Sequence, residues 1–210
     1  MMIKAVLFDF DGVLTLDETG TESICKYISS VTGIDRSIFE KEYRKHNEEL
    51  LLGELEHEEM WTELCEEIAQ DIDIKILYDS FINTPINFEM FELVYALKHN
   101  KIKIGMVTDN KADRIKTIVD HHQWIDIFDG IAISAEVGSG KSEINIFNEI
   151  FQMLDVNPNE CIFIDNSEAN LIVPKRLKVT TLFFDHKKND IVTLRKELLE
   201  AGVETLSLSK

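Results

Sequence analysis

Five short apolar runs, rich in β-branched and aromatic residues, constrain the fold of this chain more than any other feature. They cover Lys4–Phe8, Ile102–Val107, Gly130–Ser134, Cys161–Ile164 and Val179–Phe184. Runs that are apolar nearly throughout are typical of strands covered on both faces in a parallel sheet. We therefore predict a parallel sheet built from these segments, with the run at 130–134 as its weakest member.

Helical patterns separate the later runs. Apolar residues recur at helical spacing in two segments between the predicted strands. These positions are Ile115, Ile118 and Val119 with His122, and then Phe147, Ile150, Phe151 and Leu154. After residue 101 the chain thus alternates between strand and helix, which is the signature of a doubly wound α/β fold.

The segment from residue 16 to residue 87 has a different pattern. It contains several helical stretches, including Asp35–Leu52 and Glu56–Gln70, and no strand-like run. This segment therefore separates the first predicted strand from the other predicted strands in the sequence. We predict an α/β core formed by residues 1–15 and 88–210, into which an α-helical cap formed by residues 16–87 is inserted.

The charge of the chain limits its expected partners. The 39 acidic residues outnumber the 22 basic ones, and the net charge is −17 at pH 7. Such a surface repels nucleic-acid phosphates and anionic lipids, so we expect neither as a partner. It also repels small anions, so a phosphate site has to be locally positive. A divalent cation is the obvious way to make it so.

Other features of the sequence indicate the compartment. The three cysteines are odd in number, lie far apart and lack metal-ligand spacing, so we expect reduced thiols. The apolar N-terminal segment soon runs into acidic residues, which is typical of a strand and not of a signal peptide. No apolar run is long enough to span a bilayer. We expect a soluble cytoplasmic protein, whose oligomeric state the sequence does not indicate.

The strongest chemical signal is the sequence Asp-Phe-Asp-Gly-Val-Leu-Thr directly after the first predicted strand. In an open parallel sheet, ligands bind at the carboxyl ends of the strands. Asp9 and Asp11 can converge there on one small volume, because Gly12 allows the chain to turn sharply. A simple turn is the alternative interpretation, since Asp and Gly are common in turns.

Three further strand ends carry suitable groups. Thr108, Asp109 and Asn110 follow the second run and offer a hydroxyl group and backbone amides at a helix start, which suit a phosphate. A Gly-rich loop leads to Lys141 just before a helix, although its spacing is not that of a P-loop. Asp165 follows the run that begins at Cys161. Each residue alone could be a helix cap or a surface residue, but together they favour a shared site.

This ordered set resembles the hydrolases of the haloacid dehalogenase superfamily. In that family the first strand is followed by Asp-x-Asp-Gly, the second ends in Thr or Ser, a lysine precedes a later helix, and an acidic cluster follows a later strand. Asp9–Gly12, Thr108, Lys141 and Asp165 match these motifs in order. The insertion at 16–87 resembles the α-helical cap of one branch of the family.

The resemblance implies a magnesium-dependent phosphatase that hydrolyses a small phosphomonoester, such as a sugar phosphate, through an aspartyl-phosphate. Asp9 would attack phosphorus, and Asp11 would donate a proton to the leaving oxygen and later take one from water. Lys141 would stabilise the developing charge. The substrate-binding residues would be Thr108, Asp109, Asn110 and Lys141.

The resemblance also implies a Mg²⁺ site formed by the Asp9 and Asp165 side chains and the Asp11 carbonyl. Three positions depart from the family pattern. Asp109 stands where relatives often have Asn, Ser142 replaces a common Pro, and Asn166 replaces a second Asp. They bear on metal affinity and substrate fit, and leave open whether Asn166 or Glu168 joins the metal site.

Three other functions use the same residues. A phosphoglucomutase-like phosphotransferase would need the same groups but would protect the phosphorylated Asp9 from water. A haloacid dehalogenase would use Asp9 on carbon without a metal, and Asp11 and Asp165 argue against it. A non-catalytic binding module would keep the fold alone, and only the three departures favour it.

Overall fold

Five parallel strands form one sheet in the order β3-β2-β1-β4-β5. The structure is a computed structural model that describes residues 2–203, so residue 1 and residues 204–210 of the predicted core lie outside it. The strands are β1 (Ala5–Phe8), β2 (Lys103–Thr108), β3 (Gly130–Ile133), β4 (Cys161–Asp165) and β5 (Thr180–Phe183). From β1 the chain proceeds outward to β3 on one side and then to β5 on the other. The predicted strands and the doubly wound α/β class are therefore confirmed.

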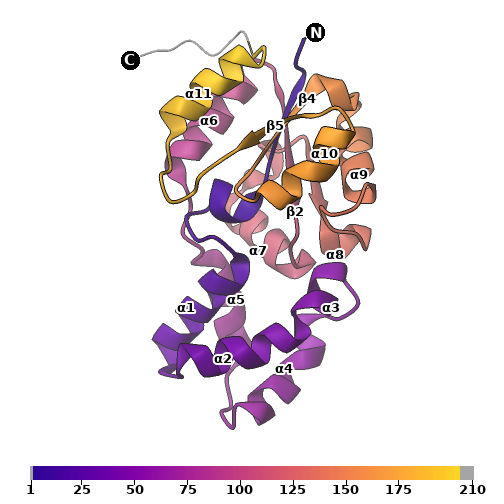
Figure 1. Cartoon of the computed structure of the whole chain (residues 1–210). Helices are drawn as coiled ribbons and strands as arrows, with labels where there is room; N and C mark the ends of the chain where they lie inside the picture. The colour runs from indigo at the N-terminus through magenta and orange to yellow at the C-terminus, as the bar shows by residue number, and fades with distance from the viewer. Residues whose placement is uncertain (1, 204–210) are drawn as a thin grey trace.

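Helices surround this sheet and fill the insertion (Figure 1). In the core they are α6 (Phe88–His99), α7 (Ala112–His122), α8 (Ser134–Val137), α9 (Asn145–Leu154), α10 (Ile172–Arg176) and α11 (Ile191–Glu200). In the insertion they are α1 (Gly20–Thr32), α2 (Arg36–Tyr43), α3 (Asn47–Leu52), α4 (His57–Glu67) and α5 (Ile74–Ile82). No helix of residues 2–203 is both long enough and apolar enough to cross a membrane.

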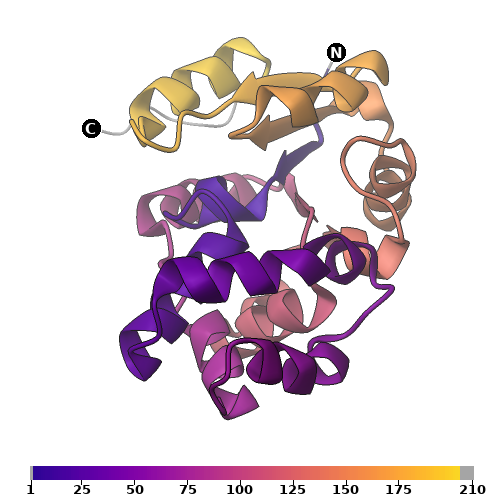
Figure 2. The same ribbon diagram turned by 60° about the horizontal axis from the view of Figure 1, so that its bottom comes forward.

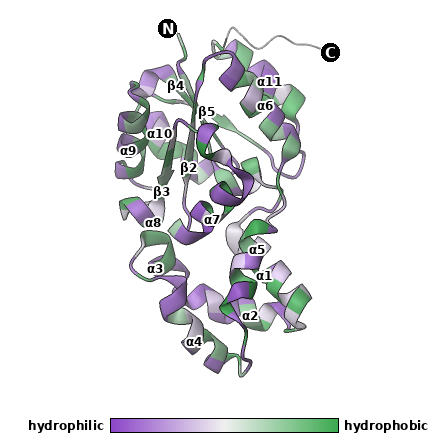
Figure 3. Cartoon of the chain, turned by 180° about the vertical axis from the view of Figure 1, so that it is seen from behind, coloured by the Kyte–Doolittle hydropathy of each residue, from purple (hydrophilic) through white to green (hydrophobic). Residues whose placement is uncertain are grey.

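The two faces of the sheet form two apolar cores. Alternate side chains of a strand point to opposite faces, so Val6 and Phe8 join the core under α6, α7 and α11, whereas Ala5 and Leu7 join the core under α9. The helices around the sheet carry both hydrophilic and hydrophobic residues along their length (Figure 3), as expected when one side of each helix faces a core.

One strand departs from the prediction of burial on both faces. The strands β1 and β4 are buried throughout, but β5 is partly exposed and the side chain of Phe183 is 46% exposed. The reason is its position, because β5 is an edge strand that only β4 pairs with. The apolar run therefore predicts the position of this strand correctly, but it does not predict whether helices cover both of its faces.

The insertion forms a layer of helices against the carboxyl ends of the strands (Figures 1 and 2). Its two connections to the core lie side by side, because Thr15 and Ile86 form an antiparallel bridge. Leu16 N donates to Pro85 O at 2.9 Å, and Asn87 N donates to Leu14 O at 3.0 Å. We propose that the boundaries between core and cap lie at this bridge, after residue 15 and before residue 88.

The cap helices differ from the prediction in one place. The prediction of a single helix over Asp35–Leu52 is wrong, because a 3₁₀ turn at Arg44–His46 separates α2 from α3. This break lets α3 reach the core, where Ser134 Oγ donates to Leu51 O at 2.6 Å. The helix predicted at 56–70 is present as α4 and is shorter, with Glu56 as its N-cap.

Candidate active site

The carboxyl ends of β1, β2 and β4 meet at a cavity of about 380 Å³ between the core and the cap. Its lining includes Asp9, Asp11, Thr108, Asp109, Asn110 and Lys141. Asp165, the last residue of β4, lies behind Lys141 and is completely buried. The structure thus brings together the residues that the sequence predicted from four distant segments.

A tight turn after β1 positions the two aspartates. Asp9 N donates to Ile164 O at 2.9 Å, which extends the pairing of β1 with β4, and Phe10 N donates to Asp9 Oδ1 at 2.7 Å. The chain then reverses at Gly12, whose φ is +76°. A Cβ atom on Gly12 would lie 2.2 Å from the Asn166 side chain. Glycine is therefore required here by both conformation and space.

Lys141 lies between two buried carboxylates. Its Nζ atom is 2.8 Å from Asp9 Oδ1 and 2.8 Å from Asp165 Oδ2. Burial lowers the pKa of Lys141, but the neighbouring Asp9 and Asp165 outweigh it, so the pKa is raised and the ammonium stays charged. Burial raises the pKa of Asp9 well above its usual range, and Asp165 and Asp11 add to this while Lys141 opposes it. The site therefore holds more carboxyl groups than the single charge of Lys141 can keep ionised, and a further cation would favour their ionised forms.

Asn170 holds Asp165 in place, and sequence reasoning missed it. Its Nδ2 atom lies 3.2 Å from each carboxylate oxygen of Asp165, and Ser167 N donates to Asp165 Oδ1 at 2.7 Å. No sequence signal pointed to Asn170 apart from its distance of a few residues from Asp165.

The residues at the end of β2 and just after it line the cavity and also contact the neighbouring segments that form it. Asp109 Oδ1 accepts a hydrogen bond of 2.8 Å from Lys141 N and so holds the Gly-rich loop. Asn110 Nδ2 donates to Thr108 Oγ1 at 3.2 Å and to Asp11 Oδ2 at 2.7 Å. Asp109 thus has a structural contact that the sequence did not reveal, and its role in substrate binding stays a prediction.

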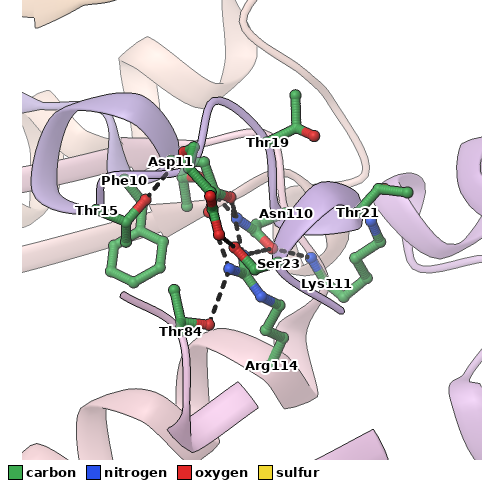
Figure 4. Close-up of polar contacts among 12 residues, drawn as sticks. Phe10, Asp11, Thr15, Thr19, Thr21, Ser23, Thr84, Asn110, Lys111 and Arg114 are labelled. Carbon is green, nitrogen blue, oxygen red and sulfur yellow. Dashed lines mark hydrogen bonds and ion pairs between the residues drawn. The ribbon is translucent and has the colours of Figure 1, made fainter. Parts of the chain in front are cut away.

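Arg114 of α7 binds Asp11 (Figure 4). Its NH1 and NH2 atoms donate to Asp11 Oδ2 and Oδ1, both at 2.8 Å, in a bidentate pair. Arg114 is completely buried, and a Cβ atom on Gly20 would lie 2.4 Å from its NH1 atom. The sequence signal was available, because Arg114 has helical spacing to the apolar Ile118.

Lys111 is a second buried cation that sequence reasoning missed. It lines the cavity, and its Nζ atom donates to Oδ1 of Asn47, a cap residue, at 2.8 Å. Thr21 Oγ1 donates to the same oxygen at 3.2 Å. Burial, together with the nearby Arg114, lowers the pKa of Lys111 to about 7.

The donor set suits a hard divalent cation. Mg²⁺ binds oxygen and is commonly held by one or two carboxylates, with water and substrate phosphate completing the shell. Asp9 and Asp165 both contact Lys141 Nζ, so one small volume is within reach of both carboxylates. No group of three or more His, Cys, Asp or Glu residues in the described range could hold a metal by itself. The carboxylate oxygens of Asp9 and Asp165 are of the kind that magnesium prefers.

Comparison with known proteins agrees with this geometry. Bacillus subtilis β-phosphoglucomutase is 27% identical over 177 residues, which cover 80% of this chain and 77% of the mutase. A sesquiterpene phosphatase of Aspergillus oryzae is 26% identical over 108 residues, which cover 51% of this chain and 55% of that protein.

Solved structures share the fold. A haloacid dehalogenase family enzyme of Bacteroides thetaiotaomicron matches with a TM-score of 0.71 and 20% identity, covering 92% of this chain and 99% of the enzyme. The same enzyme solved with magnesium and inorganic phosphate matches with a TM-score of 0.66 and 21% identity, covering 86% of this chain and 93% of the enzyme.

The family assignment rests on the sequence as well as on the fold. A family model described as haloacid dehalogenase-like hydrolase matches residues 3–177, which include every predicted site residue and the whole cap. Because strand ends, cavity and family match agree, this chain belongs to the haloacid dehalogenase-like hydrolases.

Proposed function

We propose that this hydrolase is a magnesium-dependent phosphatase that acts on a small polar phosphomonoester through an aspartyl-phosphate. The observation that carries the proposal is the environment of Asp9. Its Oδ1 atom is held by Phe10 N and Lys141, whereas Oδ2 accepts no hydrogen bond from the residues that the structure describes. One oxygen is thus anchored while the other is available at the cavity.

In the first step, Asp9 Oδ2 attacks phosphorus, the new O–P bond forms, and the bond from phosphorus to the leaving oxygen breaks. Asp11 protonates the leaving oxygen, for which its carboxyl group must carry a proton and at least one Arg114 donor must move away from it when the ester binds. When bound, magnesium would supply positive charge next to the phosphoryl oxygens, held by the Asp9 and Asp165 side chains and the Asp11 carbonyl. Lys141 adds a fixed positive charge, and the Thr108 hydroxyl group donates to a phosphoryl oxygen.

In the second step, water attacks the phosphorus of the aspartyl-phosphate and passes a proton to Asp11. Inorganic phosphate leaves and the Asp9 carboxylate is restored. The Arg114 and Asn110 contacts fix the Asp11 carboxylate at the edge of the cavity. The cap covers this side, which supports exclusion of bulk water during the first step.

The cavity lining supports a small polar leaving group. Leu51 is the only large apolar side chain among the described residues that line it. The other cap-side positions are Glu18, Thr19, Gly20 and Thr21. A lining of hydroxyl and charged groups favours a hydroxylated leaving group, such as a sugar, over an isoprenoid chain.

A panel of phosphorylated metabolites tests the proposal. We expect release of inorganic phosphate from one or more small polar esters with magnesium and loss of release in EDTA. Vanadate and fluoroaluminate, with magnesium, should inhibit as mimics of the transferring phosphoryl group. No phosphate release from any ester would contradict the proposal.

The relative from Bacillus subtilis makes phosphomutase activity the second candidate. A mutase would interconvert sugar phosphates in the presence of a sugar bisphosphate, with little net release of phosphate. Measuring isomer formation and phosphate release in the same reaction separates the two activities.

A further inference from the structure

The cap segment that runs from α3 into α4 contacts the core at both of its ends. At the first end α3 lies beside α8 (Figures 1 and 3), and Ser134 Oγ donates to Leu51 O at 2.6 Å. Gly53 approaches the core so closely that a Cβ atom on it would lie 2.0 Å from Ala135 O. At the second end His57, the first residue of α4, lies against the first turn of α7.

His57 links the cap to the core through both of its ring nitrogens. Its Nδ1 atom lies 2.6 Å from Oδ2 of Asp113 in α7, and its Nε2 atom lies 2.7 Å from the hydroxyl oxygen of Tyr43 in α2. The Tyr43 ring stacks on the imidazole with 5.8 Å between the ring centres. His57 is 1% exposed. A polar ring buried this far is costly unless its nitrogens have partners, and one of these partners belongs to the core.

The two ends of this chain of hydrogen bonds indicate where its protons lie. A carboxylate only accepts hydrogen bonds, so His57 Nδ1 donates to Asp113. Burial raises the pKa of Tyr43 well above its usual range, so its hydroxyl group keeps its proton and can donate to Nε2 of the neutral ring. Asp113 Oδ1 also accepts from Arg114 N at 2.7 Å. The cap is thus bonded to α7 directly beside the residue that holds Asp11.

A second cavity, of about 280 Å³, lies beside the pair of His57 and Asp113. Its lining includes both residues together with Gly53 of the cap and Ala135 of the core. Because the cap and the core are not close-packed at this cavity, apolar contacts there contribute little to docking. The side chain of Asp113 is 32% exposed, so water can replace His57 as its partner when the cap moves.

We infer that the chain Tyr43–His57–Asp113 is a latch that docks the cap on α7, and that His57 and Asp113 are positioning residues for the reaction. The docked segment places Leu51 in the wall of the active-site cavity. Docking itself does not depend on the proposed phosphatase function, whereas the positioning role rests on it.

Digestion with a glutamate-specific protease tests the docking. Glu54 and Glu56 are exposed between the two ends of the segment, and cleavage there requires the segment to leave the core and become extended. In Asp113→Ala we expect this cleavage to be about 10-fold faster than in the wild type, as the loss of a hydrogen bond to a charged group allows. Asp113→Asn keeps an acceptor and should recover part of the difference.

Two comparisons separate undocking from a general loss of stability. Cleavage after Glu197, in α11 of the core, reports global unfolding, so the measured quantity is the ratio of cleavage in the cap segment to cleavage at Glu197. Asp120→Ala, which removes an exposed carboxylate of the same helix as Asp113, is the control and should leave this ratio unchanged.

Steady-state kinetics test the positioning role. Undocking lowers the fraction of molecules that can bind the leaving group, so it raises KM and leaves the chemistry of the bound ester unchanged. For glucose 6-phosphate, Asp113→Ala should raise KM more than about 3-fold and change kcat less than about 2-fold. Acetyl phosphate has a much smaller leaving group, so its kcat/KM should change less than about 2-fold. Asp113→Asn should restore part of the KM.

The outcomes are separable. An unchanged cleavage ratio in Asp113→Ala would refute the latch and leave the phosphatase intact. A raised ratio with an unchanged KM for glucose 6-phosphate would refute the positioning role alone. If neither ester is hydrolysed, the phosphatase proposal fails, and calorimetric titration of glucose 6-phosphate in the presence of magnesium takes the place of KM. Equal affinities of the wild-type protein and Asp113→Ala would then refute the positioning role.

Discussion

The charged residues on the two sides of the active-site cavity come from different parts of the fold. On one side, Asp9, Lys141 and Asp165 come from strand ends and a loop of the core, and they contact one another at 2.8 Å. On the other side, Arg114 of α7 reaches Asp11 beside Gly20 of the cap, and Lys111, which directly precedes α7, reaches Asn47 of the cap. The contacts of the first group lie within the core, whereas the Lys111–Asn47 contact of the second group joins the core to the cap.

This difference teaches where chemistry and selectivity reside. Under the proposed function, the core group would surround the reacting phosphoryl group, so its charges would serve every phosphate ester. On the cap-facing side Lys111 lines the cavity and would meet the rest of the substrate, whereas Arg114 is completely buried and holds Asp11. Substitutions on the first side should therefore reduce activity toward all esters. Substitutions on the second side should change the relative activities toward different esters.

The largest expected effect is that of Asp9→Asn. The amide cannot attack phosphorus, so we expect kcat to fall on the order of 10³-fold or more for every ester. The measurement is single-turnover phosphate release, with urea unfolding to show that the fold persists. Activity near that of the wild type would remove Asp9 as the nucleophile.

The next effect is that of Asp165→Ala on the magnesium requirement. Loss of one of two carboxylates should raise the magnesium concentration for half-maximal activity at least about 10-fold. Asp120→Ala, at an exposed carboxylate on α7, is the control. An unchanged magnesium titration would place the cation elsewhere.

On the cap-facing side, Arg114→Met should destabilise the fold. Asp11 would keep its buried charge without its bidentate partner, which costs about 3 kcal/mol in the free energy of unfolding. The Arg114→Met, Asp11→Asn double variant should recover part of the loss, because the unpaired charge is gone. Additive losses in urea unfolding would mean that the pair is not coupled.

The smallest expected effect is the pH dependence caused by Lys111. Its pKa falls from 10.5 in the unfolded chain to about 7 in the fold, so the unfolded chain binds more protons between these values. The lysine's contribution to stability therefore increases as pH rises across this window and is lost as pH falls through about 7. Urea unfolding at about pH 7 and pH 9 should show the advantage of Lys111→Met shrinking with pH. A constant difference would contradict the lowered pKa.

The core side of the site could be predicted because its signals are local. Apolar runs marked the strands, and the carboxyl ends of parallel strands lie at one edge of a sheet. Asp9, Thr108 and Asp165 each directly follow or end such a run. Their proximity therefore follows from the fold class without knowledge of any side-chain contact.

The cap-facing side could not be predicted in the same way. Arg114 looked like part of a helix, and Lys111 like an ordinary cation near its start. Their partners Asp11 and Asn47 are 103 and 64 positions away in the sequence. The Lys111–Asn47 contact depends on how the cap sits on the core, and the Arg114–Asp11 pair joins two core segments that the whole insertion separates in the sequence. No local pattern encodes either contact.

The sequence by itself thus determined the sheet, the inserted helices and the strand-end residues around Asp9, because apolar periodicity and turn chemistry act over a few neighbouring residues. Only the tertiary structure decided that Arg114 pairs with Asp11 and that Lys111 is buried without a counter-ion. The physical reason is that burial and charge pairing depend on how segments far apart along the chain pack: the turn after β1 packs against α7, and the cap packs over the start of α7.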